Sequence, residues 1–264
     1  MFEPLAMPYM QRALIGGVLV GFLASYYGPF VIQRRLAFLG NGLAHAAFGG
    51  VALGILLDME PLWVAVPFTV FVAIAIVWVR ERAGIEADTA IGIFFAVSMA
   101  LGVLFLSMKQ GFTGDAFTYL FGSILAVRAS DIWLAGGVSV LSILTWPLWS
   151  RWAYATFDRT LARSDRHAVD RHDYLLSVAI AVVVVVSIKV VGILLISACL
   201  VLPAAAARIL ARTFSQMTLI SIAIGISTIL VGLYTSYYAD IPSGPAIILT
   251  QSAVFGIVLA LKRR

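Results

Sequence analysis

Charged residues are scarce in this sequence. Asp, Glu, Lys and Arg supply 12% of the 264 residues, whereas hydrophobic residues supply 62%. Because a soluble domain carries roughly 25% charged residues, the composition excludes an ordinary water-soluble fold. The apolar runs have about the 20-residue length of a membrane-spanning helix, and the alternating pattern of a membrane barrel is missing. We therefore predict an all-α integral membrane protein.

Cysteine and lysine are also rare. Cys199 is the only cysteine and lies in an apolar run, which excludes an intrachain disulfide or a cysteine-rich metal cluster and favours a packing role. The only lysines are Lys109, Lys189 and Lys262, and no Gly-x-x-x-x-Gly-Lys phosphate loop occurs. The chain therefore lacks this means of hydrolysing ATP, and we do not expect it to be an enzyme.

The net charge of +5 indicates membrane orientation rather than a nucleic-acid partner. Basic residues lie mainly in short polar stretches between the apolar runs, and basic loops beside a span stay in the cytoplasm. The arrangement that satisfies this rule best leaves four of them on the outer side: Arg12, Lys109, Arg128 and Lys189. All the other basic residues then face the cytoplasm.

We predict eight or nine membrane spans. Their approximate ranges are 11–32, 37–57, 62–79, 87–108, 131–149, 173–190, 192–211, 216–237 and 245–261. The number depends on residues 187–192, where one apolar run either turns sharply at the outer surface or continues as a single tilted helix. Residues 109–130 suit an outer loop with a short re-entrant or surface helix. We expect one transmembrane domain over residues 1–264.

The longest polar stretch, about residues 151–172, belongs in the cytoplasm. Within it Tyr154, Phe157 and Leu161 recur at helical spacing, which predicts a short helix with one apolar stripe. Such a helix could lie on the lipid surface. It could equally dock a cytoplasmic partner, and the spacing alone leaves both alternatives open.

Two histidines of this stretch lie close to aspartates. His167 and His172 are interspersed with Asp165, Asp170 and Asp173. Histidine nitrogen and carboxylate oxygen are common metal ligands. Because the segment is polar and carries charges of both signs, we interpret these residues as solvated side chains rather than as a metal site.

Two polar side chains interrupt the apolar run that follows Arg35. His45 lies ten residues further on, about 15 Å deeper in a hydrocarbon core of roughly 30 Å. Asn41 precedes it by four residues, so both side chains share one helix face. An ionisable group at this depth is costly and suggests a function. The alternative is a structural histidine that bonds a neighbouring backbone carbonyl, and we favour the functional interpretation.

The stretch from Arg34 to Gly54 resembles the second-helix motif of the permease subunits of metal-ion ABC importers. This family takes up zinc and manganese and is related in fold to the cobalamin-type importer permeases. Four further segments resemble family blocks in the family order: residues 88–95, 120–125, 190–208 and 237–245. The resemblance implies a polytopic helical bundle of eight or nine spans that imports divalent metal ions. The Ala44-His45-Ala46 version is closer to zinc permeases, with manganese or iron as alternatives.

The resemblance also implies a set of transient metal ligands in the translocation path: His45, Asn41 and Asp240. The family pattern is Gly-Asp-x-x-x-His, whereas this chain has Asn41 in place of the aspartate. A neutral amide oxygen should hold a dication less tightly than a carboxylate. A helix-packing hydrogen bond is therefore an equally good role for Asn41. Asp240, at the outer end of a span, either guides an entering cation or faces water.

The partners follow from the same resemblance. A separate cytoplasmic ATPase subunit would dock on Tyr154, Phe157, Asp158 and Leu161 and hydrolyse ATP, and an extracellular or periplasmic protein would capture the metal. Two copies of the chain would form the pathway in the bilayer of a prokaryotic cytoplasmic (inner) membrane, with no permanently bound cofactor. The competing hypotheses are an ATP-independent secondary transporter or channel, and an intramembrane enzyme that uses His45 with Ser197. The intramembrane enzyme is the least favoured hypothesis, because no activation motif surrounds His45 or Ser197.

Overall fold

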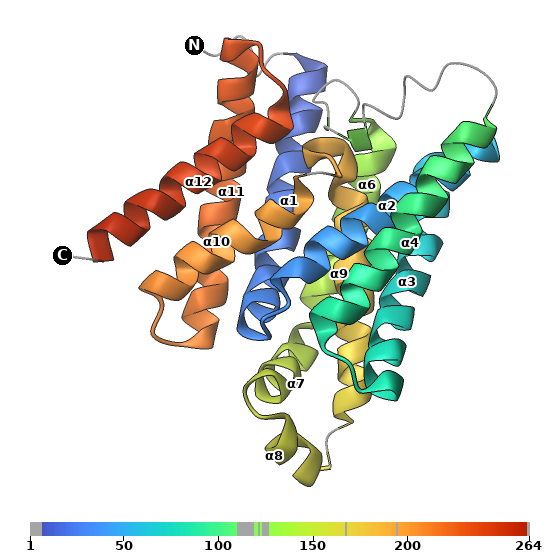
Figure 1. Cartoon of the computed structure of the whole chain (residues 1–264). Coiled ribbons are helices and arrows are strands. Elements are labelled where there is room, and N and C mark those ends of the chain that lie inside the picture. The colour runs from blue at the N-terminus through green and yellow to red at the C-terminus, as the bar shows by residue number, and fades with distance from the viewer. Residues whose placement is uncertain are drawn as a thin grey trace.

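The computed structural model describes residues 7–109, 119–120, 122, 127–166, 168–193 and 195–262. Every regular element in these ranges is a helix (Figure 1). In chain order the helices are α1 (Pro8–Gln33), α2 (Ala37–Leu56), α3 (Pro61–Ala83), α4 (Ala87–Met108), α6 (Ala129–Leu144), α7 (Trp146–Phe157), α8 (Arg159–Ser164), α9 (Val169–Val191), α10 (Ile196–Leu210), α11 (Phe214–Ala239) and α12 (Ser243–Lys262). The predicted all-α architecture is confirmed for this part of the chain. The expected surface or re-entrant helix within residues 109–130 falls mostly outside the described residues.

Seven of the described helices have the length and hydropathy to cross a membrane: α1, α2, α3, α4, α9, α11 and α12. Helices α6 and α7 pass the same test when they are taken together, although they bend by 68° at their junction. If this bent pair crosses the membrane as one span, the described residues contain eight. Helix α10 is apolar but has only 15 residues, about 22 Å against a hydrocarbon core of roughly 30 Å. The predicted span over residues 192–211 is therefore a shorter helix than the sequence suggested.

The apolar run through residues 187–192 turns rather than continuing. Helix α9 ends at Val191, and Gly192 has a φ of 94°. Glycine adopts this conformation readily because it has no Cβ. The amide of Ile193 then donates a hydrogen bond of 3.0 Å to the carbonyl of Tyr119. The sharp turn is confirmed, and the alternative of a single tilted helix is wrong.

Helices α1, α2 and α9 form the centre of the bundle (Figure 1). In each of them 72% of the most apolar window is buried, compared with 22% in α4 and in α12. Glycines allow these central helices to approach their neighbours closely. A Cβ added to Gly21 would lie 3.1 Å from the Cα of Ile226 in α11, and one added to Gly50 would lie 2.6 Å from the Cα of Ala65 in α3.

Charges gather at both ends of the bundle. Three of the basic residues assigned to the outer side pair with carboxylates at one end: Lys109 with Asp58, Arg128 with Glu60, and Lys189 with Glu60 and Asp131. Lys189 is 4% exposed, and its Nζ lies 3.0 Å from the Asp131 carboxylate. The sequence analysis did not anticipate this buried ion pair. Arginines of α3 and α8 lie at the opposite end, beside α7.

Candidate functional site

His45 lies in the middle of α2 and is 9% exposed. Its imidazole contacts the ring of Phe95 in α4 edge to face, with 4.5 Å between the ring centroids. The buried Nδ1 atom has no hydrogen-bond partner in the described part of the chain. A structural histidine would bond a neighbouring carbonyl, and no such bond to Nδ1 is present among these residues. The imidazole is therefore buried but retains a free capacity to bind a proton donor or a metal ion.

Asn41 lies one helical turn before His45 and is half-buried. It lines an open groove of about 720 Å³ between α2, α4, α10 and α12. Within the described residues, no hydrogen bond joins its side chain to a neighbouring helix. The groove therefore presents an amide without a described hydrogen bond one helical turn from His45, on the same face of α2, and His45 itself does not line the groove.

The groove also contains three further residues with side-chain oxygen atoms, of which the sequence analysis gave a role only to Ser197, in the competing enzyme hypothesis. Asp88 contributes a carboxylate from the first turn of α4, and Ser197 of α10 and Ser252 of α12 contribute hydroxyl groups. These oxygen atoms can coordinate a cation. Asp88 could have been found from sequence, because it is the only acidic residue in the first turn of its apolar helix. Among the described residues, no three His, Cys, Asp or Glu side chains form a group that could hold a metal ion.

Asp240 does not belong to the groove. It ends α11 in a left-handed conformation with a φ of 50° and is exposed. The groove begins at Arg35 and Ala37, at the opposite end of the bundle. Figure 1 shows that the end of α11 lies near the start of α1, far along the bundle from α7 and α8. The structure thus brings Asn41 and His45 to one helix face and leaves Asp240 apart.

The predicted cytoplasmic helix is divided in two. Helix α7 ends at Phe157, Asp158 is extended, and α8 begins at Arg159. The break has a local cause, because the Asp158 carboxylate accepts a hydrogen bond of 2.8 Å from the amide of Leu161 and caps α8. The expectation of one helix with a continuous stripe was therefore wrong: Tyr154 and Phe157 lie on α7, and Leu161 lies on α8.

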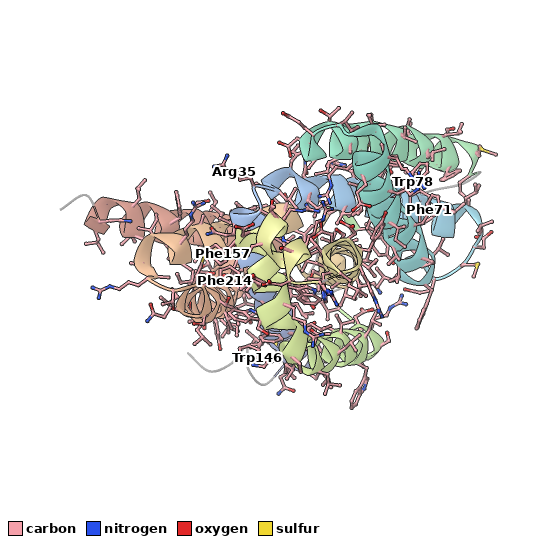
Figure 2. All side chains as sticks on the ribbon, turned by 90° about the horizontal axis from the view of Figure 1, so that it is seen from below. Arg35, Phe71, Trp78, Trp146, Phe157 and Phe214 are labelled. Carbon is pink, nitrogen blue, oxygen red and sulfur yellow. The ribbon has the colours of Figure 1, made fainter. Side chains whose placement is uncertain are left out.

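The predicted docking residues differ in exposure. Tyr154 packs beside Ala162 and donates a hydrogen bond of 2.5 Å to Asp165, so it joins α7 to the end of α8. Phe157 is 58% exposed and Leu161 is 50% exposed. Phe157 lies edge to face against Phe214 at the start of α11, with 5.5 Å between the ring centroids, as the view from below in Figure 2 indicates. Phe157 and Leu161 are available for contact, and sequence reasoning missed Phe214.

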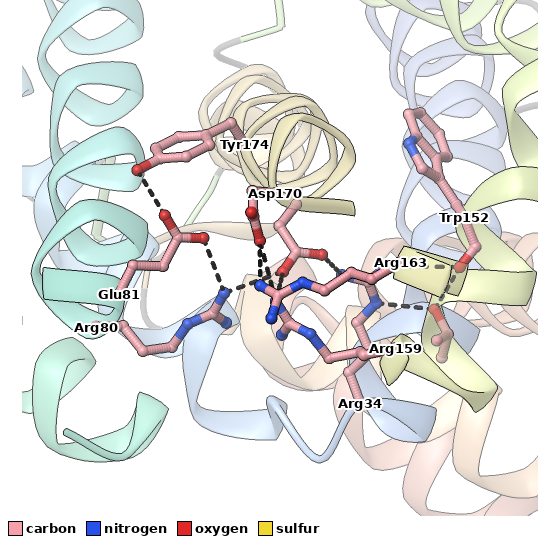
Figure 3. Close-up of polar contacts among 10 residues, drawn as sticks. Arg34, Arg80, Glu81, Trp152, Arg159, Arg163, Asp170 and Tyr174 are labelled. Atoms are coloured by element: carbon pink, nitrogen blue, oxygen red, sulfur yellow. Dashed lines mark hydrogen bonds and ion pairs between the residues drawn. The ribbon is translucent and has the colours of Figure 1, made fainter. Parts of the chain in front are cut away.

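A buried ion-pair network holds α7 and α8 to the bundle. Asp173 of α9 has a side chain that is 3% exposed and lies within 3.0 Å of three guanidinium groups, from Arg34, Arg80 and Arg159 (Figure 3). The Nε of Arg34 also donates a hydrogen bond of 2.8 Å to Thr156 of α7. Burial lowers the pKa of Arg34, and the adjacent Asp173 carboxylate opposes that shift.

This network corrects the interpretation of the charged stretch as fully solvated. Asp173 and His172 are both buried. Asp170 is exposed and pairs with Arg163 at 2.6 Å, and Asp165 is also exposed. His167 lies outside the described residues. The polar stretch is therefore solvated only in part, and its buried carboxylate is a structural tie rather than a metal ligand.

Comparisons with known proteins match this chain to membrane proteins of transport systems. The sequence profile of the ABC 3 transport family matches residues 6–262. The manganese import system permease protein ScaB of Streptococcus gordonii is 34% identical over 94% of this chain and 89% of its own length. The high-affinity zinc uptake system membrane protein ZnuB of Haemophilus influenzae is 33% identical, over 96% of each chain.

Two solved structures share the fold. PsaBC from Streptococcus pneumoniae in complex with Fab gives a TM-score of 0.86 at 32% identity, covering 96% of this chain and 92% of the matched one. An inward-facing putative metal-chelate type ABC transporter gives a TM-score of 0.76 at 14% identity, covering 96% and 86%. The second likeness concerns the fold alone.

Proposed function

The chain belongs to the ABC 3 transport family, which includes permeases of metal-ion ABC importers, and we propose that it forms the membrane path of an ATP-driven importer for divalent metal ions. The observation that carries the proposal is His45, an ionisable side chain buried in a membrane-spanning helix with no partner for Nδ1 among the described residues. Such a group inside a membrane segment marks a transport pathway more often than a packing role. Asn41 and the groove beside it supply the inner part of the path.

Zinc is the proposed cargo. Imidazole nitrogen is a good ligand for zinc, whereas manganese favours carboxylate and other oxygen donors. The donors on α2 are one imidazole and one neutral amide, and the single carboxylate that lines the groove, Asp88, belongs to α4. Relatives are named for both metals, so manganese and iron are the competitors that the test must include.

A separate ATPase subunit is the proposed source of energy. It would dock on the cytoplasmic segment of about residues 151–172, where Phe157 and Leu161 expose apolar surface on α7 and α8. Exposed apolar side chains surrounded by charges are typical of a protein–protein contact. An extracellular metal-binding protein would deliver the ion near Asp240, and a second copy of the chain would cover the open side of the groove. The proposed location is the cytoplasmic membrane of a prokaryote.

Reconstitution tests this function against a secondary transporter or channel. Proteoliposomes containing the chain and the metal-binding protein, with and without the ATPase and ATP, would be supplied with radioactive zinc, alone or with an excess of unlabelled zinc, manganese or iron. We expect uptake only when ATPase and ATP are both present, and we expect unlabelled zinc to reduce it more than manganese or iron does. Uptake driven by an ion gradient in the absence of the ATPase would contradict the proposal.

A further inference from the structure

A second pocket opens at the end of the bundle that carries α7 and α8. It has a volume of about 330 Å³ and is lined by four arginines: Arg34, Arg35, Arg80 and Arg159. They come from the ends of α1 and α3, from the α1–α2 turn and from the start of α8. No carboxylate is among the described residues that line the pocket. Figure 3 shows that three of these arginines, Arg34, Arg80 and Arg159, converge.

The charges around this pocket are not balanced. Asp173 accepts contacts from three of the four arginines, Asp170 pairs mainly with Arg163, and Glu81 lies 4.0 Å from Arg80. Asp88 follows Ala87, which lines the pocket, and shares the neighbouring groove with Arg35. The neighbourhood therefore holds five guanidinium groups and four carboxylates: Arg34, Arg35, Arg80, Arg159 and Arg163 against Glu81, Asp88, Asp170 and Asp173. One positive charge remains in excess near the pocket.

Arg35 contributes to that excess. Its side chain is exposed and makes no ion pair within the described residues. Its backbone is left-handed, with a φ of 57°. Glycine and asparagine adopt this conformation more easily than arginine does. An arginine in a strained turn, whose side chain has no hydrogen bond or ion pair among the described residues, is the kind of feature that a binding site explains.

We propose that this arginine pocket receives an acidic side chain of the ATPase subunit when that subunit docks. The inference rests on the proposed function and adds the chemistry of the contact. Thr156 and Arg159 line the pocket and flank Phe157 in sequence, so an acidic group entering it would belong to the same surface that covers Phe157. Guanidinium groups pair with carboxylates through two parallel hydrogen bonds. The apolar residues anchor the contact, and the pocket fixes its orientation.

Docking affinity in lipid nanodiscs tests the proposal. The purified ATPase would be titrated against wild-type permease, Arg35→Asn, Arg35→Lys and the control Arg128→Asn, at about 0.05 and 0.5 M NaCl, which changes the screening length about threefold. Arg128 is an exposed arginine at the opposite end of the bundle, where it pairs with Glu60. We expect Arg35→Asn to raise Kd about tenfold at low salt and much less at high salt. Arg35→Lys should keep only part of the affinity, because an ammonium group cannot form the two parallel hydrogen bonds, and Arg128→Asn should change Kd by less than about twofold.

Thermal unfolding provides the readout that separates docking from structure. Asparagine relieves the left-handed strain at position 35, so Arg35→Asn should unfold at the wild-type temperature or above it. Unchanged affinity of Arg35→Asn for the ATPase at low salt would overturn the proposal. A loss of binding to phosphatidylglycerol vesicles with unchanged ATPase docking would also overturn it, because the ligand would then be a lipid phosphate. If wild-type permease binds no ATPase at either salt concentration, the proposed function itself fails.

Discussion

Replacing Asp173 with asparagine should loosen the cytoplasmic end of the bundle. The side chain of Asp173 is 3% exposed and lies 2.5, 2.6 and 3.0 Å from Arg34, Arg159 and Arg80. Removing one partner of a buried ion pair costs about 3–5 kcal/mol. Arg159 is 43% exposed, so water compensates part of its loss, and we take about 3 kcal/mol as the cost. For a chain of this size the unfolding temperature should fall by about 6–12 °C.

Tryptophan fluorescence during heating would measure this change, because the carbonyl of the buried Trp152 accepts a hydrogen bond from Arg34. Asp165→Asn is the matched control, since Asp165 is exposed and its side chain accepts a hydrogen bond only from Tyr154 among the described residues. Its loss should cost less than about 1 kcal/mol. Equal destabilisation by Asp173→Asn and Asp165→Asn would refute the idea that the buried network ties α7 and α8 to the bundle.

Three further changes have defined outcomes. Phe157→Ala should weaken co-purification of the ATPase, by about 2 kcal/mol if the ring is a central anchor, and should uncouple ATP hydrolysis from uptake. Asn41→Asp should tighten metal binding, measured by calorimetry, because a carboxylate adds charge, and equal affinity would mean that position 41 only packs. Cysteines at Ser164 and Asp240 in a Cys199→Ala background should react with a membrane-impermeant reagent from opposite sides, and labelling from one side would overturn the orientation.

The positions of the spans could be predicted from sequence because apolar runs bounded by charges determine them. Helix α2 begins at Ala37, the predicted start, and ends one residue before the predicted end. The sequence offered the turn at residues 187–192 as one of two alternatives, and the contact that follows the turn, from the amide of Ile193 to the carbonyl of Tyr119, involves a distant part of the chain. Long-range contacts of this kind decided the points that local hydropathy left open.

The candidate site was only partly predictable. Asn41 and His45 share a helix face because of their four-residue spacing, and the structure keeps them there. The break at Asp158 was missed because a side-chain cap outweighed the apolar spacing on either side of it. The burial of Asp173 could not be inferred either. Two of its partners, Arg34 and Arg80, lie far away in the sequence, and the third, Arg159, belongs to a different helix.

The passage of the metal ion beside His45 is tested most directly by the initial rate of ATP-dependent zinc uptake in proteoliposomes containing the permease, the ATPase and the binding protein. His45→Ala removes an imidazole whose Nδ1 has no partner among the described residues, so folding and ATPase docking should persist. Thr69→Ala is the control, since Thr69 is a buried polar residue of α3 that bonds only its own helix. We expect uptake to fall about tenfold or more for His45→Ala and to stay near wild type for Thr69→Ala. Wild-type uptake by a folded and docked His45→Ala permease would contradict a metal path beside this histidine.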